Sequence, residues 1–145
     1  MNRKSVDFAL LLLRLVLAVV FFAHGSQKLL GWFGGLGLKG FVEYMSALGM
    51  PVVMSYLVIV GEFFGSLGLA VGLLTRVAAA GIFLPEMLGT VMLIKRNVGF
   101  FMNWKGVAGK VEGWEYPLTL SVVALAIIVA GAGAYSLDAK LKKRT

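Results

Sequence analysis

The chain contains no cysteine and few acidic residues. Of its 145 residues, seven are Asp or Glu, fourteen are Lys or Arg, and a single residue is His. Without cysteine it cannot exchange disulfides or hold thiolate-bound zinc or an iron–sulfur cluster. One histidine excludes a bis-histidine haem, and the lack of Glu-x-x-His pairs argues against a di-iron bundle, so we expect no metal site. Phosphate loops, nucleotide fingerprints and hydrolase triads are also missing.

Hydrophobic residues, in contrast, make up 59% of the chain. They form four apolar runs, each near the ~20 residues that cross a hydrocarbon core. The runs cover about residues 8–30, 52–74, 77–94 and 117–134. We therefore predict an all-α protein, an integral membrane four-helix bundle forming one domain over residues 1–145, with a basic C-terminal tail at 138–145.

The distribution of basic residues predicts the orientation. Four spans put both termini on one side, and more of the basic residues fall there than on the other side. The terminal side would carry Arg3, Lys4, Arg76, Lys140, Lys142, Lys143 and Arg144; the other side would carry Lys39, Lys95, Arg96, Lys105 and Lys110. Because cytoplasmic loops are enriched in Lys and Arg, we expect an inner (plasma) membrane protein with cytoplasmic termini. The net charge of +7 then serves contact with anionic lipids, and no nucleic-acid partner is expected.

The connection after the first run predicts a short helix in the membrane interface. At helical spacing, Phe41, Met45 and Leu48 share one face while Glu43 and Ser46 point away. This amphipathic pattern is typical of a helix that lies along the bilayer surface.

Five ionisable residues lie inside the apolar runs: Arg14, His24, Lys28, Glu62 and Glu86. A charged side chain at mid-bilayer costs ~2.5–3.5 kcal/mol or more, so such residues usually face the bundle interior and pair. At 100° per residue the three on the first helix form one stripe. Two cations and two acids allow neutral pairs, with His24 uncharged. Two interpretations stay open: structural ion pairs that fix helix register, or a ligand or proton site.

The flanking residues indicate how the two acids enter the bundle. Gly61, Gly65, Gly68 and Gly72 form a ridge on one face of the second span, and such ridges let another helix approach closely. Glu62 lies beside this ridge. Pro85 directly precedes Glu86; it removes one helical hydrogen bond, frees the carbonyl of Gly81 and favours a kink. The sequence does not say which acid pairs with Arg14.

The order and spacing of several motifs resemble the DoxX/DoxD-like family of small four-span membrane proteins. The matching residues are Arg14, then Phe22-Ala23-His24-Gly25-Ser26-Gln27-Lys28-Leu29, Gly49-Met50-Pro51, Gly61-Glu62-Phe63-Phe64-Gly65, Gly72-Leu73-Leu74-Thr75-Arg76, Glu115-Tyr116-Pro117-Leu118 and Gly131-Ala132-Gly133-Ala134-Tyr135-Ser136-Leu137-Asp138. The resemblance implies a bacterial or archaeal inner-membrane protein. Family members include a subunit associated with a terminal quinol oxidase, chains of thiosulfate:quinone oxidoreductase, and membrane partners of redox-defence enzymes.

Our first functional hypothesis is a quinone-linked subunit of a membrane redox complex. His24, Glu62 and Glu86 would be the catalytic residues and handle protons. Arg14 and Lys28 would bind ligand in a polar cavity, with Trp32 and Phe33 at its mouth. Quinone or quinol would be the cofactor, bound non-covalently. Because the chain has no electron carrier of its own, the protein would be at most an oxidoreductase subunit supplied by a redox partner.

Two alternatives remain. The first is a non-catalytic assembly or scaffold subunit, including a homo-oligomer held by the glycine ridge. The second is a small transporter or lipid-binding protein, although four spans are few for a transporter and paired discontinuous helices are missing. The ligand, the partner protein and the oligomeric state do not follow from the sequence.

Overall fold

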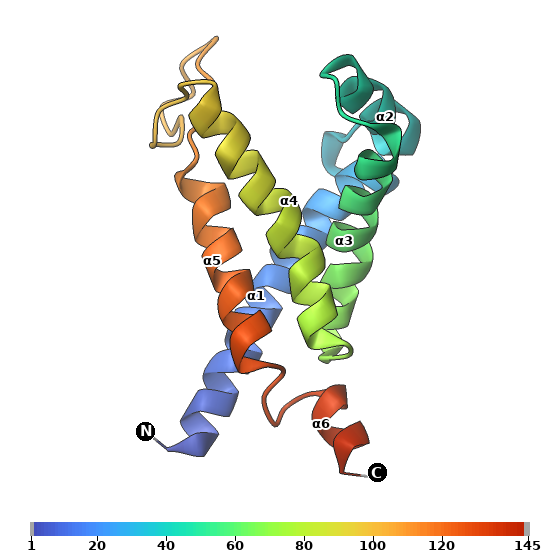
Figure 1. Cartoon of the computed structure of the whole chain (residues 1–145), viewed down its shortest axis with the longest axis vertical. Helices are drawn as coiled ribbons and strands as arrows, with labels where there is room; N and C mark the ends of the chain where they lie inside the picture. The colour runs from blue at the N-terminus through green and yellow to red at the C-terminus, as the bar shows by residue number, and fades with distance from the viewer. Residues whose placement is uncertain (1, 144–145) are drawn as a thin grey trace.

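The computed structural model describes residues 2–143, and within that range it is helical with no strand (Figure 1). Arg144, which we counted among the basic residues of the terminal side, and the last residue of the tail lie outside the described range. The elements are α1 (Arg3–Leu29), the 3-10 helix η1 (Trp32–Gly34), α2 (Gly37–Ala47), α3 (Val52–Val71), α4 (Thr75–Lys95), α5 (Glu115–Ala130) and α6 (Leu137–Lys142). The all-α membrane bundle and the short helix after the first span are confirmed.

Four of these helices correspond to the four apolar runs. α1, α3 and α4 are long and apolar enough to cross a membrane, whereas α5 is apolar but has 16 residues, or about 24 Å. The run at 117–134 is helical only as far as Ala130, because Gly131 has φ of 87°, which ends the helix. α1 begins at Arg3, where the side chain of Asn2 accepts a hydrogen bond from the N–H of Lys4.

The helices pack in the spatial order α1, α3, α4, α5. Figure 1 shows α1 crossing behind the others, with α4 and α5 in one arm and α2 and α3 in the other. The arms diverge away from the end of the molecule at which both chain termini lie, one on each side of the view. We call the end with the termini the terminal end, and the end with α2 and residues 96–114 the loop end. The core between them is formed by Leu17, Phe21, Leu69, Ile82, Ala124 and Ile127.

Three residues of the glycine ridge, Gly61, Gly65 and Gly68, lie against α4 of the same chain, whereas Gly72 lies against Arg14 and Ser136. A Cβ at Gly61 would collide with the carbonyl oxygen of Gly81, and one at Gly65 would lie 3.1 Å from the carbonyl oxygen of Ala78. Pro85 has no N–H to donate to the Gly81 carbonyl, so this freed oxygen is the atom that faces Gly61. The ridge therefore joins two helices within one chain, and this packing gives no support to a homo-oligomer held by the ridge.

We predict that Gly61→Ala destabilises the protein because the new methyl group meets backbone and not a movable side chain. Overpacking of this kind costs about 1–3 kcal/mol. Gly89→Ala is the matched control, since Gly89 also lies inside a helix, α4, but has open space around it. Thermal unfolding of the two variants in detergent is the measurement. Equal Tm values for Gly61→Ala and Gly89→Ala would contradict the close helix contact.

The connection between α4 and α5 is folded on itself. Glu115 accepts hydrogen bonds from the N–H of Met102 and the indole N–H of Trp104, and Glu112 accepts one from the N–H of Asn103. The rings of Phe100 and Trp114 meet edge to face with centroids 4.6 Å apart. These contacts give the loop end a defined outer layer.

Candidate functional site

A buried ion pair joins α1 to α3 near the loop end. The Nζ of Lys28, in the last turn of α1, lies 2.5 Å from Oε2 of Glu62 in α3. The side chain of Lys28 is 19% exposed and that of Glu62 is 4% exposed. The ammonium also lies 5.6 Å from the centre of the Phe41 ring in α2, within the range of a cation–π interaction.

Local packing explains why the two charges meet. A Cβ at Gly25 would lie 2.7 Å from the backbone of Phe63, so the absence of a side chain there lets α1 touch α3 one turn before Lys28. Phe63 directly follows Glu62. The rings of Phe22 and Phe63 stack with centroids 5.6 Å apart. Residues 24–28, which we call the HGxxK segment (His-Gly-x-x-Lys), and residues 61–65 (Gly-Glu-Phe-Phe-Gly) therefore contact each other.

Glu86 and His24 lie around this pair. Glu86 is half-buried on α4 and interacts electrostatically with both Glu62 and Lys28. It makes no salt bridge within residues 2–143. His24 is half-buried on α1, interacts electrostatically with Lys28, and its ring centre lies 6.3 Å from that of Phe21. Four of the predicted residues, from three helices, thus lie together. We call the first three the Lys28–Glu62–Glu86 group, and His24 lies beside it.

Arg14 does not belong to this group, so the neutral pairing of two cations with two acids that the sequence allowed does not include Arg14. Fourteen residues separate it from Lys28, or about 21 Å along the helix. Its fully buried guanidinium donates hydrogen bonds to the carbonyl oxygens of Leu69, at 3.5 Å, and Tyr135. Its electrostatic partner is Asp138, not Glu62 or Glu86.

Arg14 instead holds together the terminal end of the fold. Leu69 is among the last four residues of α3, whose carbonyls lack helical partners. Gly72 follows with φ of 69°, and a Cβ there would collide with the Arg14 guanidinium. The carbonyl of Gly72 accepts a hydrogen bond from the N–H of Asp138 at 2.9 Å. The buried cation thus joins α1, the end of α3 and the segment before α6.

Asp138 caps the start of α4 from this junction. Its two carboxylate oxygens accept hydrogen bonds from the N–H groups of Leu74 and Thr75, at 2.8 and 2.9 Å. Desolvation acts to raise the pKa of Asp138, but hydrogen bonds from Thr75 and Leu74 and the charge of Arg14 outweigh it. The pKa of Asp138 therefore lies below its ordinary value, and the carboxylate stays ionised as an N-terminal cap.

The predicted mouth residues, Trp32 and Phe33, follow the end of α1 and are exposed. Trp32 and Phe33 are 52% and 68% exposed and belong to η1, which folds back on the end of α1. Gln27 donates a hydrogen bond to the carbonyl of Phe33 at 3.3 Å. The Trp32 ring meets Phe22 edge to face with centroids 6.5 Å apart. An aromatic layer therefore continues from the surface to the Phe22–Phe63 stack.

Three further polar residues, Tyr116, Ser26 and Ser55, were not among the predicted site residues. Tyr116, in the first turn of α5, interacts electrostatically with Glu86. Ser26 and Ser55 are fully buried on α1 and α3, and their hydroxyls have no hydrogen-bond partner within the described part of the chain. Ser26 directly follows Gly25 in the HGxxK segment, and this position in the motif could have identified it as a site residue.

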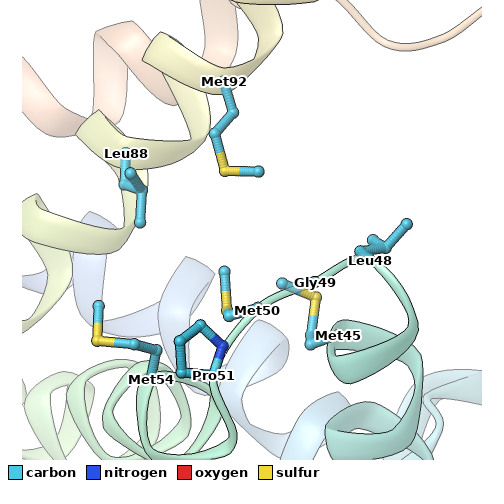
Figure 2. A pocket seen from close by; sticks show the side chains of 8 residues that line it. All are labelled: Met45, Leu48, Gly49, Met50, Pro51, Met54, Leu88 and Met92. Atoms are coloured by element: carbon cyan, nitrogen blue, oxygen red, sulfur yellow. The ribbon is translucent and has the colours of Figure 1, made fainter.

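A separate pocket of about 380 Å³ opens between the two arms at the loop end. Figure 2 shows its lining: Met92 and Leu88 come from α4, and the rest from the α2–α3 corner, namely Met45, Leu48, Gly49, Met50, Pro51 and Met54. None of these lining residues is charged. Four flexible thioether side chains give the pocket an adaptable apolar surface. The ionisable group does not line this pocket, so the predicted polar cavity around the group remains a prediction.

Comparison with known proteins matches the same segments to a family. The family model described as DoxX matches residues 9–96, which include most of α1, all of α3 and α4, and every member of the group. The chain belongs to the DoxX family. Other DoxX-type relatives match over most of their length. The chain is 32% identical to "Inner membrane protein YqjF" of Escherichia coli, covering 98% of each chain.

Two further relatives are similar to this DoxX protein. It is 27% identical to "Putative oxidoreductase CatD" of Bacillus subtilis, over 86% of this chain and 81% of the relative. It is 34% identical to an uncharacterized protein of Haemophilus influenzae, over 97% and 96%. No solved structure matches the chain.

Proposed function

We propose that this DoxX protein is a quinone-linked subunit of a membrane redox complex and that the Lys28–Glu62–Glu86 group is its ligand site. The observation that carries the proposal is a half-buried carboxyl, Glu86, which interacts with a buried ion pair but makes no salt bridge of its own. Ionisable groups at membrane depth usually mark substrate or proton pathways. The printed name of the Bacillus relative, an oxidoreductase, supports the same class of function.

The residues suit the proton chemistry of quinone reduction. Conversion of a quinone to a quinol consumes two electrons and two protons. Lys28 would donate a hydrogen bond to a ring oxygen and stabilise the negative charge that electrons place there. Glu86 would deliver a proton, and His24 would supply the second. The electrons would come from a partner protein bound to this chain.

Two other features support binding of a lipid-soluble ring. The pocket of about 380 Å³ that is lined by four methionines, the methionine pocket, has a volume within the ~300–1,000 Å³ typical of small-molecule pockets. It opens at the loop end, near which the Lys28–Glu62–Glu86 group also lies. The unpartnered hydroxyls of Ser26 and Ser55 offer further hydrogen-bond donors on α1 and α3. The pocket would receive the ring from the bilayer, and the polar groups would orient it.

The test is a titration of the purified protein with decylubiquinone, followed by quenching of tryptophan fluorescence. Glu86→Gln is expected to weaken binding at least tenfold, whereas Glu43→Gln, on the exposed part of α2, leaves it unchanged. In the isolated complex, loss of a proton donor slows quinone reduction by about 100-fold or more. Identical affinity and rate in wild type and Glu86→Gln would refute the proposal.

A further inference from the structure

A charged cavity of about 870 Å³ lies at the terminal end, far along the helices from the Lys28–Glu62–Glu86 group. It is lined by parts of α1, the start of α4, the segment after α5 and α6. Three cationic side chains border it, Arg3, Arg76 and Lys142, and two acidic ones, Asp7 and Asp138. Cations therefore outnumber acids around this space.

Both acids already bind backbone groups. Asp138 accepts from the N–H groups of Leu74 and Thr75, and Asp7 accepts from the N–H of Ala134 at 2.9 Å. Neither Arg3 nor Arg76 forms a salt bridge with them within residues 2–143. Arg76 donates one hydrogen bond, at 3.2 Å, to the carbonyl of Val129. A guanidinium has five N–H donors, so most of those on Arg76 remain available to a ligand.

An apolar groove of about 750 Å³ continues from this cavity along α3 and α4. Leu74 and Val77 line both spaces, and they are 66% and 68% exposed. From Val77 the groove follows α4 to Leu88, eleven residues or about 16 Å. That length is close to half of the ~30 Å hydrocarbon thickness of a bilayer.

We propose that the cavity and groove together bind one anionic phospholipid. Its phosphate would lie in the cavity with Arg3, Arg76 and Lys142, and one acyl chain would follow the groove past Val77 and Leu84. A head with net negative charge matches the excess of cations, which a zwitterionic head does not. A free phosphate ion would leave the adjoining apolar groove without a role. This inference does not use the Lys28–Glu62–Glu86 group, and the cavity for the head group lies at the opposite end of the molecule; the far end of the groove reaches Met54 and Leu88, which also line the pocket proposed for the quinone ring.

The test uses the purified full chain in detergent with equimolar phosphatidylglycerol and phosphatidylcholine of identical acyl chains, read by native mass spectrometry. We expect the wild type to retain phosphatidylglycerol preferentially. Arg3→Gln/Arg76→Gln should reduce that preference by about tenfold or more, since each basic residue near anionic lipid contributes severalfold. The matched control is Lys105→Gln/Lys110→Gln, which removes two charges from the loop end and should leave the preference intact.

Two further arms separate the alternatives. Leu84→Trp fills the groove and should weaken lipid retention while all three cations remain; Tm values confirm that each variant is folded. Inorganic phosphate at 10 mM should not displace the lipid. Equal retention of the two lipids by the wild type, equal loss in the Lys105/Lys110 control, or full displacement by phosphate would each overturn the proposal.

Discussion

Replacing Arg14 by methionine is expected to lower the Tm of the purified protein more than any other single substitution at the terminal end. The change leaves two carbonyl oxygens, those of Leu69 and Tyr135, without their buried donor. Each buried unsatisfied polar group costs about 1–3 kcal/mol. Asp138 also loses a neighbouring positive charge, so the junction of α1, α3 and α6 is weakened at several contacts.

Arg76→Met provides the matched comparison for this prediction. Arg76 carries the same side chain but donates one hydrogen bond to a carbonyl at an exposed site. We expect its Tm to stay close to the wild-type value, and quinone affinity to be unaffected by Arg14→Met in whatever fraction remains folded. If Arg14→Met lost quinone binding without losing stability, Arg14 would belong to the ligand site, as the sequence predicted.

Breaking the Lys28–Glu62 pair from one side is the second change with a large expected effect. Glu62→Gln leaves the Lys28 ammonium buried without the Glu62 carboxylate as its counter-charge. Lys28→Met likewise leaves the Glu62 carboxylate buried without the ammonium. Removing one partner of a buried pair costs about 3–5 kcal/mol, whereas replacing both is often close to neutral. The double variant Lys28→Met/Glu62→Gln should therefore recover most of the stability that either single variant loses.

The control for these single and double variants is an exposed ion pair within α2. Lys39 and Glu43 lie 3.9 Å apart with side chains 90% and 66% exposed. Exposed pairs of this kind contribute roughly 0–1 kcal/mol, so Lys39→Met, Glu43→Gln and their combination should change Tm little. Additive losses at Lys28 and Glu62, with no recovery in the double variant, would show that the two side chains do not pair.

The sequence predicted the elements better than their pairing. Hydropathy located the helices, and the amphipathic spacing of Phe41 and Met45 predicted α2. Glycine spacing predicted a close contact of the second span, because small residues have this use in membranes whatever the partner. Which helix lies against that face depends on the order of helices around the bundle. The local pattern does not encode that order.

The same reason explains what was missed at the site. Arg14 and Lys28 share one face of α1, but the contact of Gly25 with Phe63 places only Lys28 beside Glu62. Arg14 meets the end of α3 because the segment before α6 folds back to it, and no periodicity predicts such a return. Tyr116 approaches Glu86 through the pairing of α4 with α5, which the nineteen residues between those helices do not specify.

Mass spectrometry of small molecules extracted from gently solubilised protein tests the central claim most directly. It compares wild type with Lys28→Met/Glu62→Gln, whose stability should be close to normal, and with Lys39→Met/Glu43→Gln as the control. The proposal predicts a bound quinone in the wild type and the control and its loss from the Lys28/Glu62 variant. Absence of quinone from the wild type, or equal amounts in all three, would contradict a ligand site at this pair and leave it a structural ion pair.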